Sequence, residues 1–487
     1  MTLTEVHTAR EIETRRSRAR LSRGLEDCLP QEMIARQKVT GILRQRFEIH
    51  GFVPLDTPAI EYRDVLADGG DELRESTFGV ISREHEALAL RYELTASLAR
   101  VVAQHRDLPR PFRRYQVAPV WRCDKPGKGR LREFIQFDID SVGAPLDLAD
   151  TEVIAAIADA LGAVGLDAVI HLSDRRLLNG LLTLAAIPHS IAARVFRAMD
   201  KLAKIGPERL RRELTSGYED ESGAWIEGLA LRQAQVDRIE AFLGVPGGSR
   251  DETLLHLRDI FARQRETLED IDDLQRISDQ LRTIDLGDDR VVIDVSVVRG
   301  LAYYTSTIFE ALVRGAEGIG SVAGGGRYDN LVTRFIDERV PAVGASIGVT
   351  RLLAILKELG KLDAPKSTAR VLVGYLDPSL TDDYLALTWE LRRAGIPTEL
   401  YLGGSTSMAK QLRYADRTGI PLVILLGSTE KAHGTVSVKD MIAGRSDAAA
   451  PPESRQMATL AAQTRVPRGE VVSAIRRMLA EQEGRHA

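Results

Sequence analysis

The sequence predicts an α+β protein in which an antiparallel sheet flanked by helices is interrupted by a helical insertion and followed by a small α/β domain. Strand-rich segments occupy residues 24–171 and 287–362, dense helical periodicity fills residues 172–286, and strands alternate with helices over residues 370–487. The chain has 487 residues, which is long for one hydrophobic core, so several domains are expected.

The first elements combine a polar extension, a helix and a short strand. Residues 1–23 are rich in Arg and Glu and lack the apolar core of a secretion signal, so they predict a polar N-terminal extension. Apolar residues at helical spacing predict a helix over residues 30–50. The following "GFVPLDTPAIE" predicts a strand at a sheet edge or an interface, because Pro54 and Pro58 cannot donate to a central ladder.

A hairpin follows. "ALALRYELTASLARVVAQH" predicts a strand that turns into a helix near Leu94–Ser97. "FRRYQVAPVWRCDKPGKGRLREFIQFDIDSVG" predicts two antiparallel strands joined by a loop at Asp124–Arg130, and residues 150–164 predict a helix. In the insertion, the dense charge of "ETLLHLRDIFARQRETLEDIDDLQRISDQLRTI" indicates solvated helix faces.

Composition indicates an ordinary globular protein of a reducing compartment. Hydrophobic residues make up 44% and charged residues 28% of the chain, and the net charge of −4 does not indicate a nucleic-acid binder. The two distant cysteines, Cys28 and Cys123, argue against a disulfide framework. Because no apolar run is long enough to span a bilayer, we expect a cytoplasmic protein without a membrane partner.

An arginine lies inside an apolar, strand-like run. "VVRGLAYYTSTIFEALV" at residues 297–313 reads as one strand that carries Arg299, Tyr303 and Tyr304. A buried guanidinium is costly unless an anion meets it, so Arg299 either pairs with a structural carboxylate or faces a phosphate-bearing ligand. The rest of the chain favours the ligand.

The loop of the predicted hairpin gathers cations. Arg122, Asp124, Lys125, Lys128, Arg130 and Arg132 fall within eleven residues. Because alternate strand residues share a face, Arg130, Arg132 and Phe134 are expected to project together, with Gln136 and Asp140 further along. Cations beside an aromatic ring suit a triphosphate and a stacked base, although a solvated basic turn is the alternative.

Two further segments are candidates for ligand contact. Gly324–Gly326 precede Arg327 and Tyr328 and permit either a close backbone approach to a ligand or a tight turn. "PAVGASIGVTRLLAIL" predicts a strand that enters a helix with Arg351 near its start, where an arginine can bind phosphate or simply lie at the surface.

These motifs resemble the histidyl-tRNA synthetases, which are class II aminoacyl-tRNA synthetases, from about Gly24 onward. "TPAIE", "WRCDKPGKGRLREFIQFDID" and "GASIGVTRLL" are similar to class II motifs 1, 2 and 3, and "VVRGLAYYT" and "GGGRYD" to the two histidyl signatures. The resemblance implies a class II catalytic domain with a C-terminal anticodon-binding domain. It also implies a homodimer that activates L-histidine with ATP and Mg²⁺ and transfers it to tRNA(His).

The resemblance also assigns roles to individual residues. It places Arg299 and Arg122 as catalytic contacts to the α-phosphate and the histidine carboxylate, and it leaves any metal ligands unknown. The implied ATP-binding residues are Arg122, Asp124, Arg130, Phe134 and Arg351. The implied histidine-binding residues are Glu93, Thr95, Gln136, Asp140, Arg299, Tyr303, Tyr304 and Tyr328.

Three positions depart from the family pattern. Ala302 replaces an acidic residue close to Arg299, Ser306 stands near a usual glycine, and Thr350 precedes the motif 3 arginine where an acid is common. The alternatives are a histidine-sensing regulatory subunit of histidine biosynthesis and a ligase with a non-tRNA acceptor. The retained arginines and the intact C-terminal segment favour the synthetase. By fold-level analogy, Gln411, Arg413 and Tyr414 are expected on or beside one helix near candidate anticodon contacts, with a place in the core as the alternative for Tyr414.

Overall fold

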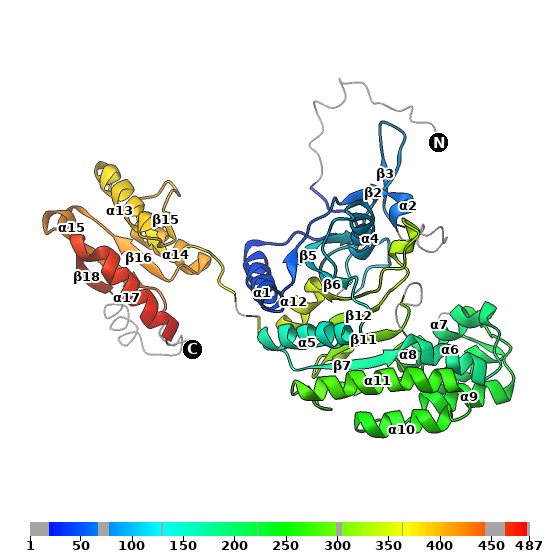
Figure 1. Cartoon of the computed structure of the whole chain (residues 1–487). Coiled ribbons are helices and arrows are strands. Elements are labelled where there is room, and N and C mark those ends of the chain that lie inside the picture. The colour runs from blue at the N-terminus through cyan, green and yellow to red at the C-terminus, as the bar shows by residue number, and fades with distance from the viewer. Residues whose placement is uncertain are drawn as a thin grey trace. The chain divides into compact units, whose positions relative to one another are not determined.

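The computed structural model describes residues 19–66, 77–127, 130–221, 223–298, 304–362, 364–443 and 463–484 (Figure 1). The chain divides into two compact units. The larger unit consists mainly of residues 39–362 and the smaller one mainly of residues 363–487.

The larger unit is built on one sheet of eight strands. Their order is β1 (Val53–Pro54), β5 (Phe112–Trp121), β6 (Glu133–Val142), β13 (Ala342–Gly348), β12 (Ala323–Arg327), β11 (Thr307–Val313), β7 (Ala168–Asp174) and β10 (Val291–Ile293). All pairs from β5 to β7 are antiparallel, and the edge strands β1 and β10 pair in parallel. The predicted antiparallel sheet is therefore confirmed, with Pro54 on an edge strand as its missing N–H requires.

The helices predicted around the sheet are also present. They are α1 (Pro30–Ile49), α4 (Thr95–Gln104), α5 (Leu148–Ala163) and α12 (Val349–Glu358). Before α4, the strands β2 (Ile60–Tyr62), β4 (Ala87–Leu90) and β3 (Gly79–Ile81) form a small sheet, and α2 (Arg63–Leu66) follows β2. The strand that turns into a helix near Leu94 is confirmed by β4 and α4.

Of the single strand expected over residues 297–313, the described residues 297–298 and 304–306 lie outside any strand. Strand β11 begins at Thr307, and Arg299–Tyr303 lie outside the described residues. Tyr304 precedes the strand, and its ring lies against Gly326 so closely that a Cβ there would be 2.9 Å from Cδ1.

The tight turn considered for Gly324–Gly326 is also wrong. These glycines belong to β12 and pair with β11 on one side and β13 on the other. At Gly325, a Cβ would be 2.3 Å from the carbonyl oxygen of Gly344, so the neighbouring strand excludes a side chain there. Because these three glycines carry no side chains, the centre of the sheet presents only backbone at these positions.

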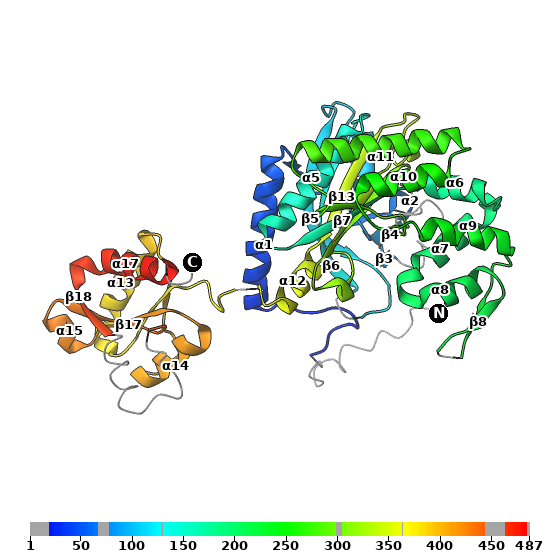
Figure 2. The same ribbon diagram turned by 90° about the horizontal axis from the view of Figure 1, so that it is seen from below.

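The segment between β7 and β10 is mostly helical, as predicted, but it is not packed as a separate body. Its helices are α6 (Arg175–Leu184), α7 (Ala192–Asp200), α8 (Leu202–Leu214), α9 (Gln233–Leu243), α10 (Arg250–Ile260) and α11 (Arg265–Thr283), with a two-stranded sheet of β8 (Gly217–Glu219) and β9 (Trp225–Glu227) (Figure 2). Strand β7 continues to Asp174, past the expected boundary at residue 171. Helix α11 packs against α5, and one continuous apolar core includes residues of both segments.

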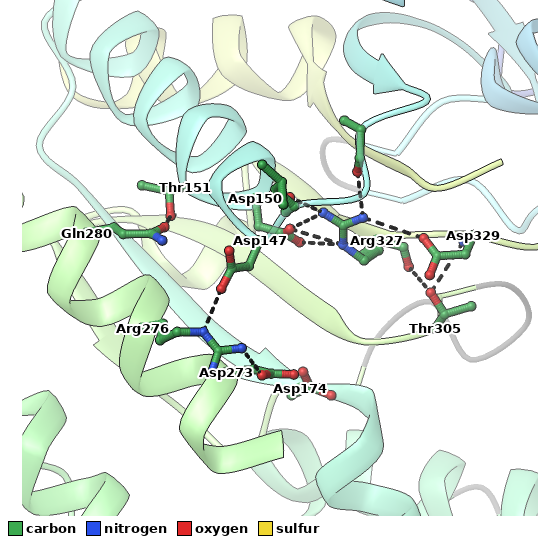
Figure 3. A network of polar contacts seen from close by, with 12 residues as sticks. Asp147, Asp150, Thr151, Asp174, Asp273, Arg276, Gln280, Thr305, Arg327 and Asp329 are labelled. Carbon is green, nitrogen blue, oxygen red and sulfur yellow. Dashed lines mark hydrogen bonds and ion pairs between the residues drawn. The ribbon is translucent and has the colours of Figure 1, made fainter. Parts of the chain in front are cut away.

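Polar contacts also join α11, α5 and β12 (Figure 3). Arg276 of α11 donates to Asp147, at 2.9 Å, and Thr151 of α5 donates to Gln280, at 2.5 Å. On the other side of α5, buried Asp150 pairs with Arg327 of β12, whose guanidinium also donates to the carbonyl oxygens of Ala144 and Leu146. Arg327 is therefore held by the protein itself.

The smaller unit is the predicted α/β domain. Its sheet has the order β15 (Thr398–Leu400), β14 (Val371–Val373), β16 (Leu422–Leu425), β17 (Thr435–Asp440) and β18 (Gln463–Pro467). The three strands β15, β14 and β16 are parallel, with antiparallel partners after them. The accompanying helices are α13 (Thr381–Arg393), α14 (Met408–Thr418), α15 (Ser428–Ala432) and α17 (Val471–Gly484), and the unit has its own apolar core.

The side chain of Gln411, which was expected near candidate anticodon contacts, is used inside the smaller unit. Gln411 is fully buried, accepts a hydrogen bond from the Tyr375 amide at 2.8 Å, and donates to the carbonyl oxygens of Tyr375 and Ser405. Tyr414 is half-buried and donates to Glu399 at 2.5 Å, whereas Arg413 is exposed. Gln411 thus fixes two loops of this unit.

Helices able to cross a membrane were sought in the described part of the chain, and none is long and apolar enough.

Candidate active site

A cavity of about 420 Å³ lies over one face of the large sheet. It is lined by β6, β12 and β13, by the start of α4 and α12, and by the loop between β5 and β6. The described residues proposed from the resemblance all line it: Glu93, Thr95, Arg122, Asp124, Arg130, Phe134, Gln136, Asp140, Tyr304, Tyr328 and Arg351. Arg299 and Tyr303 lie outside the described residues, so their placement stays a prediction.

Strand β6 supplies a row of side chains along the cavity. Phe134, Gln136, Asp138 and Asp140 alternate along the strand and all line the cavity, as the period of two requires. Asp138 was not among the expected site residues, although it has the same parity as its neighbours. Arg132, which was expected on this face, instead precedes the strand, and its amide donates to the carbonyl oxygen of Gly24.

Glycines form much of the floor of the cavity. Gly324, Gly325, Gly344 and Gly348 line it, and a Cβ at Gly344 would lie 1.9 Å from Oδ1 of Asp140. A side chain at residue 344 would therefore displace the acid. Where the sheet carries no side chains, a flat ligand can lie directly against the backbone.

One end of the cavity is cationic. Arg122, Lys125, Arg130 and Arg351 line it together with Asp124. Arg122 donates to the Tyr92 carbonyl oxygen at 3.0 Å, and its guanidinium carbon lies 5.1 Å from the Phe134 ring centroid.

Motif 3 meets this cationic end at the start of α12. Arg351 donates to the Ser321 carbonyl oxygen at 2.6 Å. Thr350, one of the departures from the family pattern, accepts a hydrogen bond from the Ile135 amide at 3.1 Å. The threonine thus joins the start of α12 to strand β6.

The other end is acidic and buried. Glu93, Asp138 and Asp140 line it, and burial raises the pKa of all three carboxyl groups, that of Asp138 to about 7. Glu93 accepts hydrogen bonds from the amides of Ala96 and Thr95, at 2.7 and 3.3 Å, which orients it at the start of α4. Asp140 accepts a hydrogen bond from the hydroxyl of Tyr328, whose pKa is raised by burial and by this acid.

Asp140 has a buried cationic partner that sequence analysis did not identify. Arg114 of β5 lies directly opposite Asp140, and its Nη2 is 2.7 Å from Oδ2 of the carboxylate. The guanidinium is fully buried and makes no hydrogen bond of good geometry with the described residues, so the contact is an ion pair. The hairpin register could have indicated the pair, because Arg114 and Asp140 both lie two residues from the end of their strands.

The described residues of the cavity were searched for metal ligands. Within the described ranges, no group of three or more His, Cys, Asp or Glu side chains is placed to hold one. The cationic end of the cavity is suited to phosphate oxygens rather than to a divalent cation.

Comparisons with known proteins agree with this geometry. The family profile described as histidyl-tRNA synthetase matches residues 24–352, and that of an anticodon binding domain matches residues 370–478. Curated relatives are the histidine–tRNA ligase of Dinoroseobacter shibae, 40% identical over 97% of this chain and 99% of the relative, and that of Paracoccus denitrificans, 39% identical over 95% and 98%.

A solved structure shows the same likeness. The crystal structure of histidyl-tRNA synthetase from Nostoc sp. PCC 7120 has a TM-score of 0.78 and 30% identity, and it covers 95% of this chain and 100% of that one. The cavity, the two matched profiles and the relatives along the full length agree. This chain belongs to the histidyl-tRNA synthetase family.

Proposed function

We propose that this chain is a histidine–tRNA ligase. It joins L-histidine to the α-phosphate of ATP, releases pyrophosphate, and transfers the histidyl group from the adenylate to the terminal adenosine of tRNA(His). The main support for this proposal is that the two ends of one cavity differ in charge. Arginines and an aromatic ring line one end, and buried carboxyl groups line the other. This arrangement suits a triphosphate nucleotide and a small cationic amino acid bound side by side.

Activation requires positioning and fixed positive charge. The histidine carboxylate attacks the α-phosphorus, the bond to the leaving pyrophosphate breaks, and negative charge gathers on phosphate oxygens. Arg122 and Arg130 supply guanidinium groups where that charge develops, and Phe134 and Arg351 hold the adenine between them. The resemblance assigns Arg299 to the α-phosphate as well, and this role stays a prediction.

Recognition of histidine uses the acidic end. Glu93, Thr95 and Gln136 hold the α-ammonium, while Asp140 and Tyr304 contact the two ring nitrogens and Tyr328 fixes Asp140. A site that hydrogen-bonds both nitrogens rejects amino acids that lack them, because buried groups would be left unpaired.

Mg²⁺ is proposed as a companion of ATP rather than as a resident metal. Since the described residues form no cluster of three metal-ligating side chains, the ion would be held mainly by phosphate oxygens and water.

The smaller unit is proposed to bind the anticodon of tRNA(His), in keeping with the profile that matches residues 370–478. The chain is further proposed to act as a cytoplasmic homodimer. Three hydrophobic side chains near motif 1 support a dimer interface there. Val53, Ile60 and Tyr62 are 45–49% exposed, and exposed hydrophobic side chains that lie together are typical of a protein–protein interface.

The test has two steps. Exchange of pyrophosphate into ATP that depends on histidine separates an activating enzyme from a histidine sensor, and charging of a tRNA(His) transcript separates a tRNA ligase from a ligase with another acceptor. The same exchange assay on Ala302→Asp measures what the missing acid costs. Absence of histidine-dependent exchange in the wild type would refute the proposed function.

A further inference from the structure

We propose that Asp138 is a further histidine-binding residue, and that its carboxylate receives the α-ammonium group of the amino acid together with the side-chain oxygen of Gln136, which lines the cavity beside it. The inference rests on the proposed function, because it names an additional contact in the same site. Asp138 lies within the motif 2 segment, but the resemblance assigns it no role.

The strand register places these groups together. In the pairing of β5 with β6, Gln116 lies directly opposite Asp138, and in the pairing of β13 with β6, Ser346 lies opposite it on the other side. Gln136 precedes Asp138 by two residues on the same face of β6, and its amide donates to Ser346 at 2.5 Å and to Asp138 at 3.3 Å. Asp138 is 2% exposed and lines the cavity.

Charge balance distinguishes Asp138 from the two neighbouring acids. Asp140 is paired with Arg114, and Glu93 is oriented by two backbone amides and attracted by Arg122. Among the described residues, Asp138 has no ion-pair partner and only the Gln136 and Ser346 side chains as hydrogen-bond donors. A buried carboxyl group without a direct ion-pair partner favours either a proton or a cationic ligand.

Two further acceptors beside Asp138 lack donors. Oε1 of Gln116 and Oε1 of Gln136 are both buried and receive no hydrogen bond within the described ranges. The Gln116 amide is used, since it donates to Asp56 and Thr57 at 3.1 Å, so its carbonyl oxygen is fixed with no donor of its own. An ammonium group has three N–H donors, which suffice for the Gln136 oxygen and the carboxylates of Glu93 and Asp138, all of which line the cavity with Thr95.

The raised pKa of Asp138 couples binding of the ammonium group to the release of a proton. Burial raises the pKa of Asp138 to about 7, Arg114 opposes that rise, and Asp140 and Glu93 add to it. The titratable and charged groups that act on Asp138 are Arg114 on β5, Asp140 on β6, and Glu93 and Arg91 before α4. A bound ammonium would stabilise the ionised carboxylate, so the acid loses its proton as the ligand enters.

The test uses histidinol, which keeps the α-ammonium but lacks the carboxylate, and imidazole propionate, which keeps the carboxylate but lacks the ammonium. Both are titrated calorimetrically at pH 7 against the wild type, Asp138→Asn and the matched control Asp159→Asn. Asp159 pairs with Arg46 and His50 and does not line the cavity. Titration in two buffers of different ionisation enthalpy measures the protons released.

Asp138→Asn is expected to weaken histidinol binding about 10- to 100-fold and to leave imidazole propionate within about twofold. It is also expected to abolish a release of about half a proton per histidinol that the wild type and Asp159→Asn share. An unchanged KM for ATP in pyrophosphate exchange shows that the variant is folded.

Equal loss of both ligands would place Asp138 against the ring and overturn the inference, as would unchanged histidinol affinity. In either case, histidine-dependent exchange by the wild type would leave the proposed function standing.

Discussion

Arg114 and Asp140 face each other across neighbouring strands, with 2.7 Å between the guanidinium Nη2 and the carboxylate Oδ2, and both side chains are almost completely buried. The carboxylate also lines the cavity, whereas the guanidinium lies behind it. Arg114 therefore acts as a positioning residue: it stabilises the ionised form of the acid that faces the amino acid.

Replacing Arg114 with Met is expected to destabilise the larger unit by about 3–5 kcal/mol, because it leaves the buried Asp140 without its cation. Chemical denaturation measures this loss, and the KM for histidine is expected to rise more than that for ATP. Arg113→Met is the matched control, since Arg113 forms a part-exposed pair with Glu152 at 3.1 Å and its loss is expected to cost no more than about 2 kcal/mol. Equal losses in the two variants would contradict the special position of Arg114.

Gly344→Ala is expected to abolish histidine-dependent pyrophosphate exchange. The added methyl group would lie 1.9 Å from Oδ1 of Asp140, so the acid or strand β13 must move. Gly41→Ala is the control: nothing lies within 4 Å of a Cβ at this position inside α1, and the change is expected to stabilise the protein by about 0.5–1 kcal/mol. An active Gly344→Ala enzyme with normal affinity for histidine would show that Asp140 does not need this glycine.

The stability of the ligand-free protein is expected to depend on the ionisation of Asp138. Its pKa is about 7 in the folded chain against 3.8 ordinarily, so the folded state favours the protonated acid. The stabilisation is complete below pH 3.8 and is lost as the pH rises through 7. Between pH 5 and 8 the free energy of unfolding of the wild type should therefore fall by about 2–3 kcal/mol more than that of Asp138→Asn. Parallel pH profiles for the two proteins would contradict this expectation.

Gln411→Ala is expected to destabilise the smaller unit by about 2–5 kcal/mol, because it leaves the amide of Tyr375 and the carbonyl oxygens of Tyr375 and Ser405 without partners. Thermal unfolding of the full chain measures the loss, and histidine-dependent pyrophosphate exchange should be unchanged at temperatures where the unit is folded. The exposed Arg413 serves as the control, with little effect of Arg413→Ala on stability. If Gln411→Ala left the unfolding temperature unchanged, its buried hydrogen bonds would not be structural.

Local patterns predicted much of this fold. Alternation along β6 identified Phe134, Gln136 and Asp140 as one row, and the strand-to-helix change before Arg351 is present as β13 and α12. Both signals depend only on the period of the backbone, which neighbouring segments do not alter.

The parts that failed depend on contacts between distant segments. A run of β-branched and aromatic residues suggested one strand over 297–313, but β11 begins at Thr307. The glycines of β12 are explained by their neighbours: Gly325 faces the backbone of Gly344, a relationship that no local pattern contains. The role of Arg114 was missed and the burial of Gln411 was not expected for the same reason, since their partners come from other strands and loops.

The shared core of α5 and α11 bears on attempts to shorten this enzyme. Buried side chains of α5, such as Ile154 and Leu161, belong to the same apolar cluster as Ile271 and Leu274 of α11. Excision of residues 175–286 would expose the apolar side chains of α5 to solvent, and it would also remove Arg276, the partner of Asp147. A shortened catalytic fragment would therefore need new polar residues on α5, because α11 covers the apolar face of α5 in the intact chain.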